Sequence, residues 1–125
     1  MTSIVEHADA LAALGWTDQL SAHIPPELNT SAPMRVAVRH RAGLDLIGPT
    51  GALRVPIPLP HVLAPDPIDP TPCSGDWVLV ENDVVTATLP RHTRLVRKVV
   101  GRSTRPQVVA ANLDRVFLVT SMNAD

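Results

Sequence analysis

The sequence predicts an all-β protein built around a small five-stranded barrel with a helical extension at its N-terminus. Between residues 34 and 89, apolar and polar residues alternate with the period of a β-strand in five short stretches. Turn-forming residues separate these stretches. Five strands in so short a span must close to protect their edges, which favours a barrel over a sandwich.

The helical extension is predicted over residues 1–33. Ile4, Ala8 and Leu11 recur at helical spacing, and Gly15 can end a helix in the left-handed conformation. Thr17 can cap a second short helical turn, which Pro25-Pro26 would stop.

The barrel is predicted over residues 34–90. Its strands are expected near residues 34–41, 44–46, 53–57, 76–81 and 84–89. Asn82-Asp83 suits a tight hairpin between the last two. Residues 56–72 contain seven prolines, so this stretch is expected to be an extended loop rather than a strand or helix.

The composition changes after Pro90. Residues 91–105 hold six cations and no acid, and we interpret residues 91–106 as a basic linker. Residues 107–125 contain an uninterrupted apolar run, which is typical of a strand buried on both faces of a parallel sheet. We therefore expect residues 107–125 to be the first strand of a truncated α/β domain, whose exposed edge could cause self-association.

Several function classes are excluded by composition. A net charge of −1 excludes a globally basic nucleic-acid-binding protein, so any anion site must be local. Lys98 is the one lysine, and no Gly-x4-Gly-Lys-Ser/Thr motif occurs, so this chain should neither bind nor hydrolyse a nucleoside triphosphate. One cysteine and five scattered histidines predict neither catalytic residues nor a metal site. Without a signal sequence or a membrane span, we expect a soluble, cytoplasmic protein with no membrane partner.

The basic run is the one positive functional signal. Ten of the eleven cations are arginines, whose forked guanidinium suits phosphate oxygens. Aromatic side chains are scarce, which favours phosphates of folded, double-helical RNA over stacking on single-stranded bases. The candidate RNA contacts are, in order of preference, Arg91, Arg94, Arg97 and Lys98, then Arg102 and Arg105, then Arg39 and Arg41 of the first strand. The alternative is that the run is a solvated linker.

Four stretches resemble the N-terminal part of the ribosome small-subunit-dependent GTPases, circularly permuted enzymes that assist late maturation of the small ribosomal subunit. They are Leu14-Gly15-Trp16, Ser74-Gly75-Asp76-Trp77-Val78, TLPRHTRLVRK at 88–98 and, most specifically, QVVAANLDRVFLVTSMNAD at 107–125.

The resemblance implies an OB-fold barrel at residues 34–90 that docks on rRNA of the small (30S) subunit, and a GTPase domain that opens at residues 107–125. GTP, Mg²⁺ and a structural Zn²⁺ would bind to the missing remainder of the parent, which is a GTP hydrolase. The GTPase domain of that parent would be a further partner of this chain. The alternative function is a protein-interaction module that packs on that GTPase domain or on a protein partner, without binding RNA.

Overall fold

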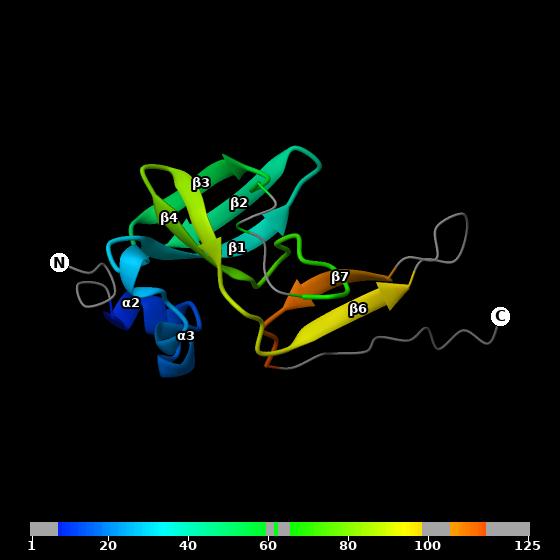
Figure 1. Cartoon of the computed structure of the whole chain (residues 1–125), viewed down its shortest axis with the longest axis horizontal. Helices are drawn as coiled ribbons and strands as arrows, with labels where there is room; N and C mark the ends of the chain where they lie inside the picture. The colour runs from blue at the N-terminus through cyan, green and yellow to red at the C-terminus, as the bar shows by residue number, and fades with distance from the viewer. Residues whose placement is uncertain (1–7, 60–61, 63–65, 99–105, 115–125) are drawn as a thin grey trace, which may run out of the picture.

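The predicted all-β fold is confirmed in a computed structural model, which describes residues 8–59, 62, 66–98 and 106–114. Five antiparallel strands form one curled sheet in the order β3-β2-β1-β4-β5 (Figure 1). They are β1 (Ala32–Arg39), β2 (Gly43–Gly48), β3 (Gly51–Pro56), β4 (Trp77–Glu81) and β5 (Val84–Thr88). The result is an OB-like half-barrel.

The sheet leaves β3 and β5 at its two edges, so packing rather than strand pairing joins them. Val55 of β3 and Val85 of β5 lie in the same buried apolar cluster, and Ile57 and Val62 of the proline-rich loop pack against it. β3 ends at Pro56, where the ring nitrogen has no hydrogen to donate to a neighbouring strand. The loop therefore contributes apolar cover to this cluster.

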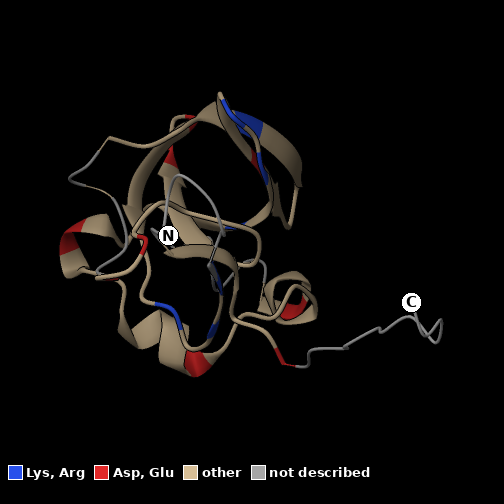
Figure 2. Cartoon of the chain, turned by 90° about the vertical axis from the view of Figure 1, so that its right-hand side faces the viewer, with Lys and Arg blue, Asp and Glu red and all other residues tan. Residues whose placement is uncertain are grey.

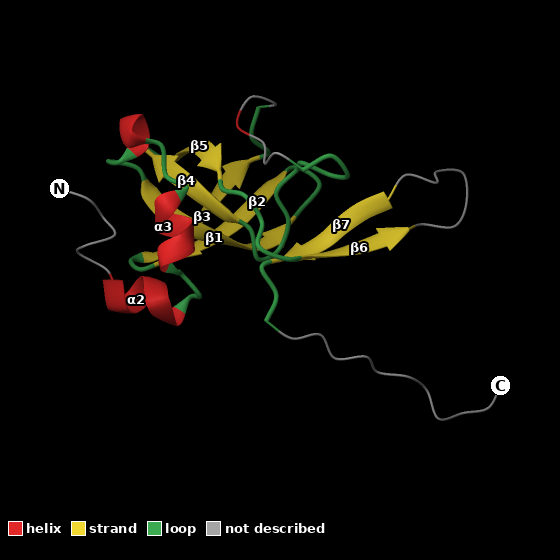
Figure 3. Ribbon diagram, turned by 60° about the horizontal axis from the view of Figure 1, so that its bottom comes forward, coloured by secondary structure: helices red, strands yellow, loops and turns green. Residues whose placement is uncertain are grey.

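The helical extension is confirmed for its described part. It contains α2 (Ala8–Ala13), α3 (Asp18–Ala22) and the 3-10 turn η1 (Pro26–Leu28). Thr17 caps α3, because its Oγ1 accepts a hydrogen bond from the Leu20 amide at 3.4 Å. Leu11 and Leu20 are buried against Trp77, and both helices lie at the end of the sheet away from β6 and β7 (Figures 1 and 3). Ile4 lies outside the described residues.

A second, two-stranded sheet joins part of the segment interpreted as a linker, residues 91–106, to the start of the segment at 107–125. β6 (Arg94–Lys98) pairs antiparallel with β7 (Pro106–Ala111), with a bulge beside Leu95, and the hairpin projects from the barrel (Figure 1). The first described residues of the 107–125 segment thus pair with β6 rather than with a parallel strand. The apolar run at 116–119 lies outside the described residues, so the domain boundary at 107 stays a prediction.

Gly75 is the point where β7 meets the barrel. Ser74 forms a parallel bridge with Ala110, and the Ala111 amide donates to the Ser74 carbonyl oxygen at 2.9 Å. Gly75 has φ +94°, and a Cβ there would collide with the Ala111 carbonyl oxygen. Only glycine allows both the left-handed backbone and this close approach. None of the helices in the described ranges is long and apolar enough to cross a membrane.

Gly75→Ala should lower the free energy of unfolding by at least about 2 kcal/mol, because it adds a steric clash to left-handed strain. Urea titration followed by tryptophan fluorescence measures this loss. Gly51→Ala is the matched control: Gly51 also has positive φ, but nothing lies within 4 Å of its Cβ position. Equal losses in the two variants would contradict the close-approach argument.

Candidate nucleic-acid interface

Arg91, a first-choice RNA contact, is buried in an ionic cluster. Its side chain is 3% exposed. Nη1 donates to Asp66 Oδ2 at 2.8 Å, Nη2 to Asp76 Oδ2 at 2.9 Å, and Nε to Asp76 Oδ1 at 3.0 Å. The carbonyl oxygens of Asp69 and Thr71 accept further hydrogen bonds from the same guanidinium. The arrangement therefore leaves no exposed fork for a phosphate at this position.

Two aspartates of the proline-rich loop reach two further predicted contacts. Asp66 Oδ2 also lies 3.3 Å from Arg94 Nη1, and Asp69 Oδ2 lies 3.8 Å from Arg39 Nη1. Together with Asp76, they place three carboxylates among three arginines. The charges in this cluster balance, so Arg39 and Arg91 in particular serve the fold.

Local turns of the backbone orient the carboxylates of Asp66 and Asp69. Asp66 Oδ1 accepts from the Ile68 amide at 2.8 Å, and Asp69 Oδ1 accepts from the Thr71 amide at 3.2 Å. Each is the Asx turn that an aspartate forms with a backbone amide two residues later. The other oxygen of each carboxylate is then held toward the arginines. The two Asp-Pro pairs of the loop, at residues 66–67 and 69–70, thus position two carboxylates of the cluster.

The cluster shifts the pKa values of its members. Burial raises the pKa of Asp66, but hydrogen bonds from the Ile68 amide and Arg91, together with the charge of Arg94, outweigh it and hold that pKa below its usual value. Burial and the neighbouring Asp76 charge raise the pKa of the Cys73 thiol to about 12. Cys73 therefore stays a neutral thiol and is no nucleophile at physiological pH.

Arg35, which lies in β1, joins three of the stretches that carry the family resemblance. Its Nη1 donates to the Leu14 carbonyl oxygen at 2.6 Å, its Nε to Gly75 at 3.1 Å and its Nη2 to Asn112 at 2.9 Å. The guanidinium also lies over the buried Trp77 ring, 5.7 Å from its centroid. Arg35 thus connects the helical extension, the residues before β4 and the residue after β7 through hydrogen bonds from one guanidinium. This role was not predicted from the sequence.

Among the residues whose exposure is described, exposed cations remain at two places. Arg94, whose side chain is 37% exposed, and Arg97 lie on β6. Arg41 is exposed between β1 and β2, and the side chain of Arg54 on β3 is 72% exposed, although Asp45 Oδ1 accepts from its Nε at 2.7 Å. In Figure 2 the Lys and Arg segments of the ribbon lie in separate groups. The backbone of Lys98 pairs with Pro106 in the hairpin, and Arg102 and Arg105 lie outside the described residues.

Arg54 was absent from the predicted contacts, although it alternates with apolar residues on its strand. Its hydrogen bond, followed by that of His40, lowers the pKa of Asp45 to about 2. Within the described ranges, no group of three or more His, Cys, Asp or Glu side chains could hold a metal ion.

The chain is similar in sequence to a set of known bacterial proteins. The chain is 35% identical over 125 residues to the small ribosomal subunit biogenesis GTPase RsgA of Mesorhizobium japonicum, covering 98% of this chain and 34% of that protein. It is 37% identical over 94 residues to the RsgA proteins of Xanthomonas campestris and Xanthomonas oryzae, covering 74% of this chain and 26% of theirs. This chain is a homologue of the N-terminal third of RsgA.

The resemblance found in the sequence is thereby confirmed. No protein-family model matches the chain, and no solved structure matches it significantly. The chain spans about a third of the length of the RsgA proteins it matches.

Arg91→Ala should destabilise the fold by about 3–5 kcal/mol, because it strands the buried carboxylates of Asp66 and Asp76. Arg97→Ala, the matched control on exposed β6, should change stability by no more than about 0.5 kcal/mol. Urea unfolding of both variants measures the difference. Similar small losses in both would show that the cluster is not structural.

Arg54→Ala should raise the pKa of Asp45 from about 2 toward its ordinary value, because it removes the largest cause of the shift. In the native chain the carboxylate and its ion pairs persist above that ordinary value and are lost as pH falls through about 2. Carboxyl ¹³C NMR titration reports the change, with Arg97→Ala as a control that should leave Asp45 unaltered. An unshifted titration in Arg54→Ala would contradict the pairing.

Proposed function

We propose that this chain is the RNA-docking module of a small ribosomal subunit biogenesis GTPase and is not itself a catalyst. Its exposed arginines contact phosphates of small-subunit rRNA. GTP hydrolysis, and the binding of GTP, Mg²⁺ and structural Zn²⁺, belong to the part of the parent beyond this chain. The parent acts on the small ribosomal subunit in the cytoplasm. The names of the RsgA relatives and the OB-like half-barrel support this role.

The observation that carries the proposal is the exposure of Arg94 and Arg97 on a projecting hairpin. Arg97 makes no ion pair with any described residue, so its charge is uncompensated there. Among the described residues Arg94 has one carboxylate partner, Asp66, which it shares with Arg91. These two arginines lead the contact set, and Lys98, Arg102 and Arg105 of the same basic run in the sequence extend it. Arg39 and Arg91 leave the set because the ionic cluster uses their guanidinium groups.

A second contact region lies on the sheet. OB-fold barrels bind nucleic acids along the face of strands 2 and 3 and at the loop between strands 1 and 2. Arg41 lies in that loop and Arg54 on β3. Because Asp45 offsets the Arg54 charge, Arg41 contributes the stronger attraction for phosphate.

One observation favours the alternative of protein docking. Leu95 and Val96 on β6 are 41% and 39% exposed, and such apolar side chains suit a protein partner or the parent's own GTPase domain. Apolar docking and phosphate contact differ in their salt dependence, because only phosphate contact releases counterions.

Arg97→Ala should weaken binding to a fully paired RNA hairpin and flatten the slope of log K against log salt by about 0.7–0.9, the release expected from one phosphate contact. Fluorescence anisotropy at several salt concentrations measures both. Leu95→Ala, two residues earlier on β6, should leave RNA affinity and slope unchanged. If Leu95→Ala weakens binding to a protein partner while Arg97→Ala leaves RNA binding intact, the docking alternative replaces this proposal.

A further inference from the structure

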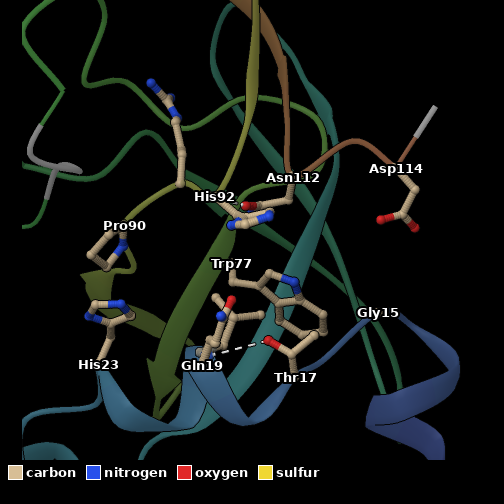
Figure 4. A pocket seen from close by; sticks show the side chains of 11 residues that line it. Gly15, Thr17, Gln19, His23, Trp77, Pro90, His92, Asn112 and Asp114 are labelled. Carbon is tan, nitrogen blue, oxygen red and sulfur yellow. Dashed lines mark hydrogen bonds between the residues drawn. The ribbon is translucent and has the colours of Figure 1, made fainter. Parts of the chain in front are cut away.

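A cavity of about 330 Å³ opens beside the root of the hairpin (Figure 4). Its walls come from three segments far apart in the sequence: α3 with the turn before it, the start of β4, and the residues that flank β6 and β7. The side chains that matter here are Gln19, His23, Trp77, Pro90, His92 and Asn112. Cavities of this size hold small molecules or single groups of larger ligands.

The side chains around the opening are mostly planar rings and amides rather than cations. Two imidazoles, a proline ring and two side-chain amides surround the opening (Figure 4). The guanidinium of Arg91 belongs to the ionic cluster and is already saturated, and Asp114 adds a carboxylate at the rim. This lining disfavours a phosphate. It suits a neutral heteroaromatic ring, because histidine stacks on nucleobases and amides recognise their edges.

Some hydrogen-bonding groups around the cavity have no partner among the described residues, and others are already engaged. Trp77 is 0% exposed, and its Nε1 has no acceptor among the described residues. Asn112 is fixed, since its Oδ1 accepts from the His92 amide and its Nδ2 donates to Gly75. The side chains of Gln19 and His92 are exposed and make no hydrogen bond within the described ranges. They are therefore available to a ligand.

We propose that this cavity receives one unpaired nucleobase of an RNA whose phosphates lie along β6. The inference rests on the proposed function and narrows it. His92 precedes Arg94 by two residues, so a base seated beside His92 directs its own backbone toward the arginines of the hairpin. The preferred RNA is then a helix with a bulged nucleotide, which the sequence alone did not predict. Trp77 packs in the core, as its burial requires, and the base stacks instead on His92 and Pro90.

The test compares two RNA hairpins that differ only in one bulged nucleotide, with 2-aminopurine at the bulge. Affinity is measured by anisotropy with the full 125-residue chain at one salt concentration. The bulged RNA should bind about tenfold more tightly, the gain typical of one stacked base, and its 2-aminopurine emission should change on binding. His92→Ala and Gln19→Ala should abolish this preference without altering affinity for the paired hairpin.

Both variants should fold, because His92 contributes only its backbone amide to the hydrogen bonds described and alanine favours the helix at position 19. Asn29→Ala, an exposed site outside the cavity, is the control and should keep the preference. Equal affinity for the two hairpins, or a preference that survives in both cavity variants, overturns the inference while leaving RNA docking in place. Absence of binding to either hairpin would defeat the proposed function as well.

Discussion

The burial of the Arg91 guanidinium is the constraint on which the rest of this structure depends. A buried cation is tolerated only when carboxylates and carbonyl oxygens satisfy all its donors, and here the proline-rich loop supplies most of them. That loop cannot be held by strand pairing, because proline lacks the amide hydrogen that a ladder needs. Side-chain contacts to Arg91 therefore hold it, and they fix the exit from β5 at the same time.

The cluster also decides which cations face outward. Asp66, Asp69 and Asp76 offset the charges of Arg39, Arg91 and partly Arg94, so a basic stretch in the sequence yields a smaller basic surface. The exposed cations that these aspartates do not offset include Arg97 on the β6–β7 hairpin. Val108 and Ala111 of β7 are buried against Cys73 and Ile68, which anchors one strand while its partner β6 presents Arg97. Fold stability and ligand contact are thus divided between neighbouring arginines.

The five barrel strands were predictable because alternation with period two is a local signal. The prolines marked the loop after β3 correctly over its described residues. The β6–β7 hairpin was not predicted, because a dense run of cations indicates a solvated segment. The strand that pairs with β6 begins only at Pro106, so no local pattern links the two strands. Charge likewise gives no sign of burial: Arg91 and Arg97 look alike in the sequence. Only the distant Asp66 and Asp76 distinguish them. The cavity joins three separate segments, so no local pattern could reveal it.

The most direct test of this division of labour is an NMR spectrum of the arginine Nε–H groups recorded while small-subunit RNA is added. All ten arginines can be followed at once, with the RNA-free chain as the reference. The account predicts that the Arg97 and Arg94 signals shift progressively while those of Arg91 and Arg35 stay in place and exchange slowly with solvent. A shift of the Arg91 signal with Arg97 unaffected would contradict it.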